Sequence, residues 1–331
     1  MSFLDKHLNI IPIDVSIDPV RPVARAIITH GHGDHARRGH GAVLATADTI
    51  AIMKTRYGED SAGSFQALDY GVPLMIEDVE VTLFPAGHIL GSAQVRLRYR
   101  GETIVDTGDY KRLKDATAQP FELVPCDILV TEATFGLPVF QHPRPEAEIA
   151  RLLKSVAAEP TRTHLVGAYA LGKAQRVMSL LRAAGYERPI YLHGAMVELC
   201  QLYERLGVPL GPTKLAIEAT KTELAGQIVI APPGAVKDRW SRRLADPVIA
   251  VASGWMSVKQ RARQGGVELP LVISDHADWN ELRQTIAETG AGQIWVTHGR
   301  EDALVYWCQQ QGLSAEPLNL VGYDESGEGG E

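Results

Sequence analysis

Apolar segments of strand length recur along the chain, and an ionisable residue follows six of them. Short apolar runs of about four to eight residues bounded by turn signals are typical of buried strands. The segments are residues 23–29, 81–84, 103–105, 127–131, 271–273 and 294–297, which lead to His30, His88, Asp109, Glu132, His276 and His298. In layered α/β folds the ends of the strands form the ligand crevice, so we expect these side chains to converge.

Helical and strand patterns alternate in the middle of the chain. Helix patterns cover residues 145–158, 172–184 and 195–206, and strand patterns cover residues 164–167, 189–192, 228–231 and 248–251. Such alternation predicts a parallel sheet with helices on its faces. Prolines at 138, 143 and 145 mark one end of this stretch, and residues 265–270 mark the other. Two further helices, over residues 279–289 and 302–311, are expected around the last strand.

Composition bounds the class of protein. The chain has 331 residues, 45% of them hydrophobic and 22% charged, as in an ordinary globular protein of one or two domains. Its three cysteines form no CxxC pair, so we expect reduced core residues and a cytoplasmic location. No apolar run approaches the roughly 20 residues of a membrane helix, and the start of the chain does not resemble a signal peptide. Residues 324–331 are acidic and Gly-rich, which predicts a disordered tail.

Four potential metal ligands stand in six residues, in the motif His30-Gly31-His32-Gly33-Asp34-His35. His30 and His32 are two residues apart, so in an extended segment both point to one side. Asp34 and His35 follow where the chain can turn, so they point elsewhere, and the glycines permit tight bends. The loop can therefore supply two ligands to each of two neighbouring metals.

The other candidates have weaker local signals. His88 stands in a second Gly-flanked turn, and Asp109 in Gly108-Asp109 could be an ordinary turn residue or a bridging ligand. Asp106 competes with Asp109 for the ligand role. Glu132 could cap a turn or act in catalysis. Four other histidines lack the strand-end context, and we expect them to be structural or surface residues: His40, His142, His164 and His193.

The ligand series resembles the metallo-β-lactamase superfamily, whose early structural Asp is matched by Asp18. Glu132, the segment around His276 and His298 resemble the three additional motifs of the β-CASP nucleases. A narrower resemblance, to bacterial ligase-associated DNA exonucleases, is carried by residues 170–176, 252–256 and 273–279. The resemblance implies an αββα sandwich with an inserted β-CASP α/β cap. The sandwich would comprise residues 1–136 and 271–323, and the cap residues 137–270.

The resemblance also implies a set of roles. One metal would be bound by His30, His32, His88 and Asp109, and the second by Asp34, His35, Asp109 and His298. Nitrogen and oxygen ligands of this mix suit zinc, and manganese is compatible with them. Catalysis would involve Asp34, Glu132 and His276, with a metal-activated hydroxide as nucleophile and His276 as general acid.

Candidate nucleic-acid contacts lie in the predicted cap. Lys173 and Arg176 open a helix, where free N–H groups bind phosphate, although an ordinary solvated helix start has the same composition. Arg239 and Trp240 combine charge with an aromatic ring that could stack on a base. Ser274 begins the segment that resembles the second β-CASP motif, Ser274-Asp275-His276-Ala277-Asp278. A net charge of −7 argues against a uniformly basic binder but not against a local basic groove over bound metals.

The sequence therefore favours a metal-dependent DNA exonuclease that acts on single strands or free ends, leaves 5′-phosphates and works with a DNA ligase. An RNA-processing nuclease is the first alternative, because a His at the position of His298 resembles the RNA-processing branch. A small-molecule hydrolase such as a thiolesterase is disfavoured by the long insertion with its basic clusters. A non-catalytic scaffold is disfavoured because every ligand position is filled.

Overall fold

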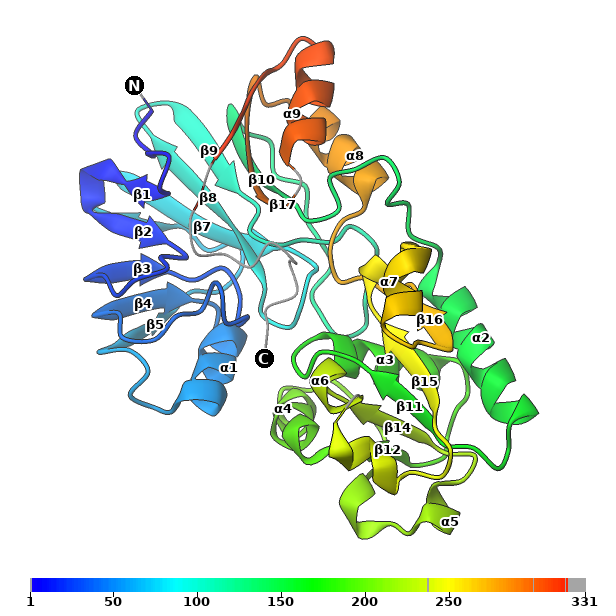
Figure 1. Cartoon of the computed structure of the whole chain (residues 1–331). Coiled ribbons are helices and arrows are strands. Elements are labelled where there is room, and N and C mark those ends of the chain that lie inside the picture. The colour runs from blue at the N-terminus through cyan, green and yellow to red at the C-terminus, as the bar shows by residue number, and fades with distance from the viewer. Residues whose placement is uncertain (1, 237, 300, 319, 321–331) are drawn as a thin grey trace. The chain divides into compact units, whose positions relative to one another are not determined.

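The computed structural model describes residues 2–236, 238–299, 301–318 and 320, which fold into two compact units. The first unit contains the chain up to Gln141 and again from His276 onwards, and the second contains His142–Asp275 (Figure 1). The predicted acidic tail, residues 324–331, lies outside the described residues. No helix in the described part of the chain is long and apolar enough to cross a membrane.

The first unit holds two sheets. The five-stranded sheet has the order β1-β2-β3-β4-β5, and the seven-stranded sheet has the order β18-β17-β10-β9-β8-β7-β6. The strands of the first sheet are β1 (Asn9–Ile10), β2 (Val15–Ile17), β3 (Arg25–Ile27), β4 (Ala42–Ala45) and β5 (Phe65–Ala67). Those of the second are β6 (Leu74–Ile76), β7 (Val79–Pro85), β8 (Ala93–Tyr99), β9 (Glu102–Asp106), β10 (Ile128–Ala133), β17 (Gln293–Gly299) and β18 (Ser314–Pro317).

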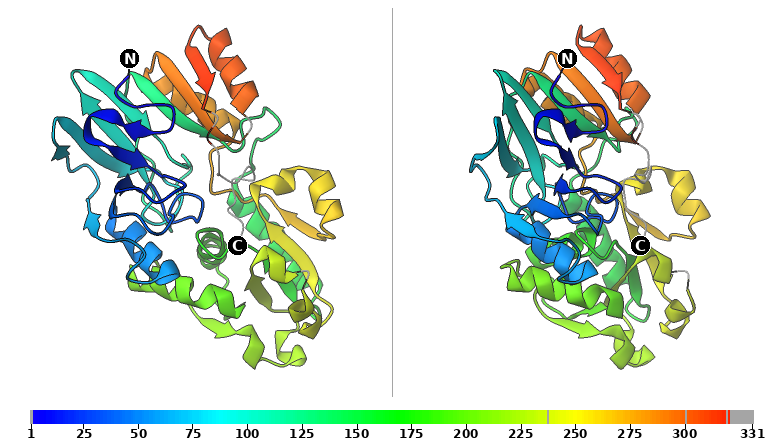
Figure 2. Two further views of the ribbon diagram at one scale, coloured as in Figure 1. Left: turned by 60° about the vertical axis from the view of Figure 1, so that its left-hand side comes forward. Right: turned by 90° about the vertical axis from the view of Figure 1, so that its left-hand side faces the viewer.

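Among the described residues, three apolar clusters pack this unit together. One contains residues of both sheets, among them Ile17, Ile27, Val81 and Val130, so the two sheets share a core. A second joins the other side of the five-stranded sheet to α1 (Ala47–Tyr57). The third joins the seven-stranded sheet to α8 (Trp279–Thr289) and α9 (Glu301–Gln310), which lies beside β17 and β18 (Figure 2).

Strand direction brings the predicted ligands to one edge. Strands β9, β10 and β17 are mutually parallel, so their carboxyl ends lie at the same edge of the sheet. Strand β7 runs antiparallel to β8, which runs antiparallel to β9, so β7 ends at that edge as well. The Ala93 N–H at the start of β8 donates to the Thr29 carbonyl at 2.8 Å, which fixes the loop after β3 against this edge.

The second unit is a parallel sheet with the order β13-β12-β14-β11-β15-β16. Its strands are β11 (His164–Gly167), β12 (Ile190–Leu192), β13 (Thr213–Leu215), β14 (Ile228–Ala231), β15 (Val248–Ala252) and β16 (Leu269–Leu271). Its helices are α2 (Pro145–Ala158), α3 (Lys173–Ala183), α4 (Gly194–Arg205), α5 (Lys221–Leu224), α6 (Pro233–Val236) and α7 (Lys259–Gln264). Short 3-10 helices are η1 (Ile11–Ile13), η2 (Ala216–Glu218), η3 (Arg239–Arg243) and η4 (Gly254–Ser257).

One predicted strand is displaced. We expected residues 271–273 to be extended, but β16 ends at Leu271. The Val272 N–H donates to the Glu148 carboxylate at 2.8 Å, and the Ile273 N–H turns back to the Leu271 carbonyl at 3.0 Å. A side chain of α2 therefore takes the N–H that a longer strand would have paired.

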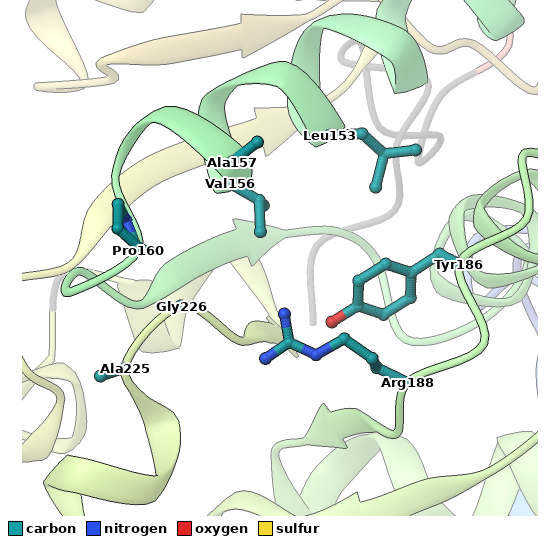
Figure 3. Close-up of a pocket in the computed structure, with 8 residues that line it drawn as sticks. All are labelled: Leu153, Val156, Ala157, Pro160, Tyr186, Arg188, Ala225 and Gly226. Carbon is teal, nitrogen blue, oxygen red and sulfur yellow. The ribbon is translucent and has the colours of Figure 1, made fainter.

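A cavity of 410 Å³ opens in the second unit between the end of α2 and the turn after α3 (Figure 3). Val156, Tyr186 and Arg188 line it, and Figure 3 shows the Arg188 guanidinium near the Tyr186 hydroxyl. Its lining residues Pro160, Arg188 and Gly226 precede β11, β12 and β14, so it lies at the amino ends of these strands. Ligands of open parallel sheets bind at the carboxyl ends, so this cavity is not where we expect a substrate.

Substitution of two glycines of the first unit would distinguish the cost of backbone strain from the cost of a steric clash. Gly87 and Gly71 have nearly equal positive φ values, +75° and +73°, but a Cβ on Gly87 would lie 2.3 Å from the Lys111 carbonyl oxygen, whereas one on Gly71 would meet nothing within 4 Å. We predict that Gly71→Ala lowers the free energy of unfolding by about 1–2 kcal/mol, the cost of a left-handed non-glycine residue.

Gly87→Ala should cost about 1–3 kcal/mol more, because the backbone at Lys111 must move. Chemical denaturation of both variants, followed by a probe of the first unit, checks the difference. Equal losses for the two variants would contradict the packing constraint.

Candidate metal centre

The loop after β3 and the turn after β7 bring three imidazoles together. The His32 Nδ1 atom lies 3.1 Å from the His30 Nε2 atom and 3.0 Å from the His88 Nε2 atom. The Asp109 Oδ2 atom lies 3.4 Å from the His30 Nε2 atom. Ligands of a tetrahedral zinc ion are about 3.3 Å apart, given Zn–N distances of about 2.0–2.1 Å, so this spacing fits a cation at the centre of the group.

A second group shares the same carboxylate. His35, Asp109 and His298 each offer one ligand atom, and these atoms lie within 4.8 Å of one another. The His35 Nε2 atom lies 3.5 Å from the Asp109 Oδ2 atom and 3.8 Å from the Asp34 Oδ2 atom. Asp109 therefore belongs to both groups and is placed to bridge two cations.

Local backbone geometry presents these ligands. Asp106 is buried, and its Oδ1 atom accepts a hydrogen bond from the Gly108 N–H at 2.9 Å, which closes the turn that carries Asp109. Asp106 is in none of the ligand groups found among the described residues, so Asp109 is the better ligand candidate of the two. Asp34, which we expected to bind the second cation, is in none of these groups either. His298, at the end of β17, has a φ of 56°, a left-handed conformation that histidine adopts more readily than most residues.

Asp18 orients one of the ligands. Its Oδ2 atom lies 2.7 Å from the His35 Nδ1 atom, and its Oδ1 atom accepts from the Thr29 N–H at 2.8 Å. A carboxylate at one ring nitrogen fixes the tautomer and turns the other nitrogen towards the metal position. His35 thus faces Asp109 with its Nε2 atom. A contact missing from our sequence analysis supports the same loop: Arg56 of α1 donates to the Gly31 carbonyl at 2.7 Å.

Glu132 and His276 form a pair beside the shared carboxylate. The His276 Nδ1 atom lies 2.9 Å from the Glu132 Oε2 atom, and both side chains are buried. The other Glu132 oxygen accepts from the Tyr110 N–H at 2.7 Å. The His276 Nδ1 atom is 3.9 Å from the Asp109 Oδ2 atom. A carboxylate at Nδ1 fixes the tautomer and the orientation of the His276 ring.

Burial and neighbouring charges shift the pKa values of several side chains in this cluster. Burial lowers the pKa of His30 and, aided by the neighbouring His35, lowers the pKa of His298 to about 3. Burial acts in the same direction on His35, but the carboxylates of Asp109, Asp34 and Asp18 outweigh it and raise its pKa to about 10. Burial raises the pKa of both Asp106 and Asp109 to about 7.

Bound divalent cations would counter the unfavourable effect of burial on the charges of these side chains. They favour neutral imidazole and ionised carboxylate together, so metal binding at this cluster would be coupled to the release of protons. The donor set, its burial and its spacing all fit two divalent ions.

The predicted contacts of the second unit lie in different environments. Lys173 and Arg176 are buried and form ion pairs with Asp275, at 2.9 Å and 3.1 Å. Ser274 is also buried. Arg239 is exposed on η3, and the half-exposed Trp240 packs edge-on against His193, with ring centroids 4.6 Å apart. A role of these residues in nucleic-acid binding stays a prediction.

Comparisons with known proteins indicate which proteins this chain resembles. No family profile matches the sequence. The chain is 29% identical over 306 residues to a "Probable DNA ligase" of Opitutus terrae, which covers 90% of this chain and 29% of that protein. It is 32% identical over 219 residues to the endoribonuclease ysh-1 of Neurospora crassa, which covers 53% of this chain and 26% of that protein.

Both matches, together with the ligand series, support a β-CASP nuclease of the metallo-β-lactamase superfamily as the kind of protein that this chain resembles. The chain spans less than a third of the length of these two curated relatives. A crystal structure of a protein of unknown function from Enterococcus faecalis resembles it with a TM-score of 0.51 and 14% identity, over 82% of this chain and 74% of that one. That likeness concerns the fold alone.

The shared carboxylate generates a prediction about metal content. His88 belongs only to the first ligand group and His298 only to the second, whereas Asp109 belongs to both. After reconstitution with zinc and desalting, His88→Ala and His298→Asn should each keep one bound ion, and Asp109→Asn should keep neither, because it weakens both sites. The ratio of zinc to protein, measured by mass spectrometry of the metal, checks this. A loss confined to one ion in Asp109→Asn would contradict the bridging role.

Proposed function

We propose that the protein is a metal-dependent DNA exonuclease that hydrolyses phosphodiester bonds at single strands or free ends and leaves 5′-phosphates. The observation that carries the proposal is the pair of ligand groups joined by Asp109, with the His276–Glu132 pair beside it. Two cations about 4 Å apart suit the in-line displacement of phosphate esters, which needs charge stabilisation at both the attacking and the leaving oxygen.

We further propose how the cations are held. One would be bound by His30, His32, His88 and Asp109, and the other by Asp34, His35, Asp109 and His298. Zinc fits the nitrogen and oxygen donors best, with manganese as the second choice. When bound, the two ions would supply an acidified water and neutralise charge on the phosphodiester. Asp34 would also act in catalysis by holding its cation beside the reacting bond.

The chain's own residues then handle the leaving group. As the phosphorus–oxygen bond breaks, the 3′-oxygen of the departing strand needs a proton. His276 is our candidate donor, and Glu132 holds its imidazole through the Nδ1 atom at 2.9 Å. Glu132 is itself fixed by the Tyr110 N–H, next in sequence to Asp109, so the donor and the bridging ligand share one support.

We also propose the domain organisation, the nucleic-acid contacts and the cellular location of the protein. The first unit, up to Gln141 and from His276 onwards, would form the αββα sandwich that we expected over residues 1–136 and 271–323. The second unit, His142–Asp275, would form the β-CASP cap that we expected over residues 137–270. The cap would grip the nucleic acid through Arg239 and Trp240, with Ser274 as a further candidate contact. Lys173 and Arg176, which we expected to bind phosphate, are instead paired with Asp275. The three cysteines are free and buried, which is in keeping with the reducing cytoplasm.

DNA is favoured over RNA by the likeness to a protein named a probable DNA ligase, which extends over 90% of this chain. A DNA ligase is accordingly the partner we propose. The endoribonuclease relatives, together with His298, support RNA processing as the alternative.

Digestion of matched end-labelled DNA and RNA oligonucleotides, single- and double-stranded, with zinc or manganese tests the substrate class. We expect DNA to be degraded from its ends at least about tenfold faster than RNA, a difference of roughly 1.4 kcal/mol in transition-state free energy. His30→Ala, which removes a ligand, should be inactive on both. Faster cleavage of RNA would favour the alternative, and no cleavage of either by the metal-loaded protein would refute the proposal.

The general acid has a separate signature. His276→Gln should reduce the rate on DNA by about 10²–10⁴-fold, because the 3′-oxygen leaves without a donated proton. Cleavage of thymidine 5′-(p-nitrophenyl phosphate), whose leaving group needs no proton, should fall far less. Rates on both substrates, with zinc content measured in parallel, check this. An equal loss on both substrates would argue that His276 has another role.

A further inference from the structure

Asp275 immediately precedes His276 in the chain and forms ion pairs with two buried, positively charged side chains. The Lys173 Nζ atom lies 2.9 Å from its Oδ2 atom, and the Arg176 Nη1 atom lies 3.1 Å from its Oδ1 atom. All three side chains are at least 95% buried. Each carboxylate oxygen has its own cation, so the carboxylate is fixed in orientation as well as in place.

Lys173 and Arg176, which we call the clamp on Asp275, lie in the first turn of α3. Lys173 and Arg176 are three residues apart on a helix, so both side chains project from one face. Gly172 begins the helix with a φ of 86°, and its N–H donates to the Gln175 Oε1 atom at 2.8 Å. The Gln175 amide donates in turn to the Ala170 carbonyl at 2.8 Å. The segment that carried the family resemblance therefore fixes its own backbone and aims two cations at Asp275.

The residues after Asp275 are fixed as well. Glu132 lies 2.9 Å from the His276 ring, and the Ala277 N–H donates to the Tyr110 carbonyl at 2.6 Å. Three consecutive residues are thus tied to three different supports. Glu132 and Tyr110 hold His276 and Ala277, and the ion pairs of Asp275 hold the residue directly before them.

We propose that Asp275 is a positioning residue, which Lys173 and Arg176 clamp so that the backbone before His276 holds the imidazole in its reactive place. The inference rests on the proposed function of His276 as proton donor. It assigns Lys173 and Arg176 to the support of the reaction in place of direct contact with phosphate. A displacement of about 1 Å at a reacting group can cost about 10²-fold in rate, so the clamp has a measurable effect.

Asp275→Asn tests the clamp, because it removes the charge and keeps the shape of the side chain. We expect the maximal rate on single-stranded DNA to fall about 10–100-fold, with KM and zinc content unchanged. The rate on thymidine 5′-(p-nitrophenyl phosphate) should fall by much less, because its leaving group needs no donor. A merely structural role would lower both rates together, and that result would overturn the inference.

Glu148→Gln is the matched control. Glu148 is also a buried carboxylate of the second unit paired with an arginine, Arg151, at 2.7 Å, but it anchors Val272 and not the residue beside His276. It should leave the ratio of the two rates unchanged. Should Asp275→Asn not fold, Arg176→Lys keeps the charge, and it should lower the DNA rate selectively by a smaller factor.

The remaining outcomes are distinguishable. If Lys173→Gln raised KM on both substrates without changing the ratio of maximal rates, Lys173 would bind phosphate directly and the inference would fail. An active wild type with an equally active Asp275→Asn would overturn only this inference. A metal-loaded wild type that cuts neither substrate would overturn the proposed function first.

Discussion

The site depends on one buried carboxylate surrounded by imidazoles. Asp109 is nearly inaccessible to solvent, and its Oδ2 atom lies within 4 Å of His30, His35, His88 and His276. A carboxylate in such a place is unstable when ionised and alone, as the rise of its pKa to about 7 indicates. Divalent cations would remove that cost and at the same time organise the histidines. The fold therefore places at this edge an arrangement of side chains that fits metal ions.

Strand direction makes this arrangement possible. The parallel run β9, β10 and β17 places Asp109, Glu132 and His298 at one edge, and the antiparallel hairpins bring His88 to the same edge. The loop after β3 comes from the other sheet and is bound to β8 through Thr29. Ligands distant in sequence meet because β7, β9, β10 and β17 end at one edge of the sheet and the loop after β3 is bound against that edge.

Much of this was predictable from the sequence, because ligand chemistry and strand ends are local signals. The candidates His30, His32, His35, His88 and Asp109 needed only spacing and turn residues, and ligand groups among the described residues contain all five, whereas Asp34 is in none of them. Two features were not predictable from local pattern. The end of β16 at Leu271 depends on a carboxylate from α2, and the burial of Lys173 and Arg176 depends on a partner about a hundred residues away. The local sequence of a helix start with two basic residues is the same whether these side chains face solvent or pair with a buried aspartate.

The central claim is that Asp109 is shared by two cations. A crystal structure of the zinc-loaded protein, with anomalous data collected on both sides of the zinc absorption edge, tests it most directly. The account predicts two anomalous peaks, each with an Asp109 oxygen at about 2.0–2.2 Å. A single peak, or two peaks of which one has no Asp109 oxygen among its ligands, would contradict it.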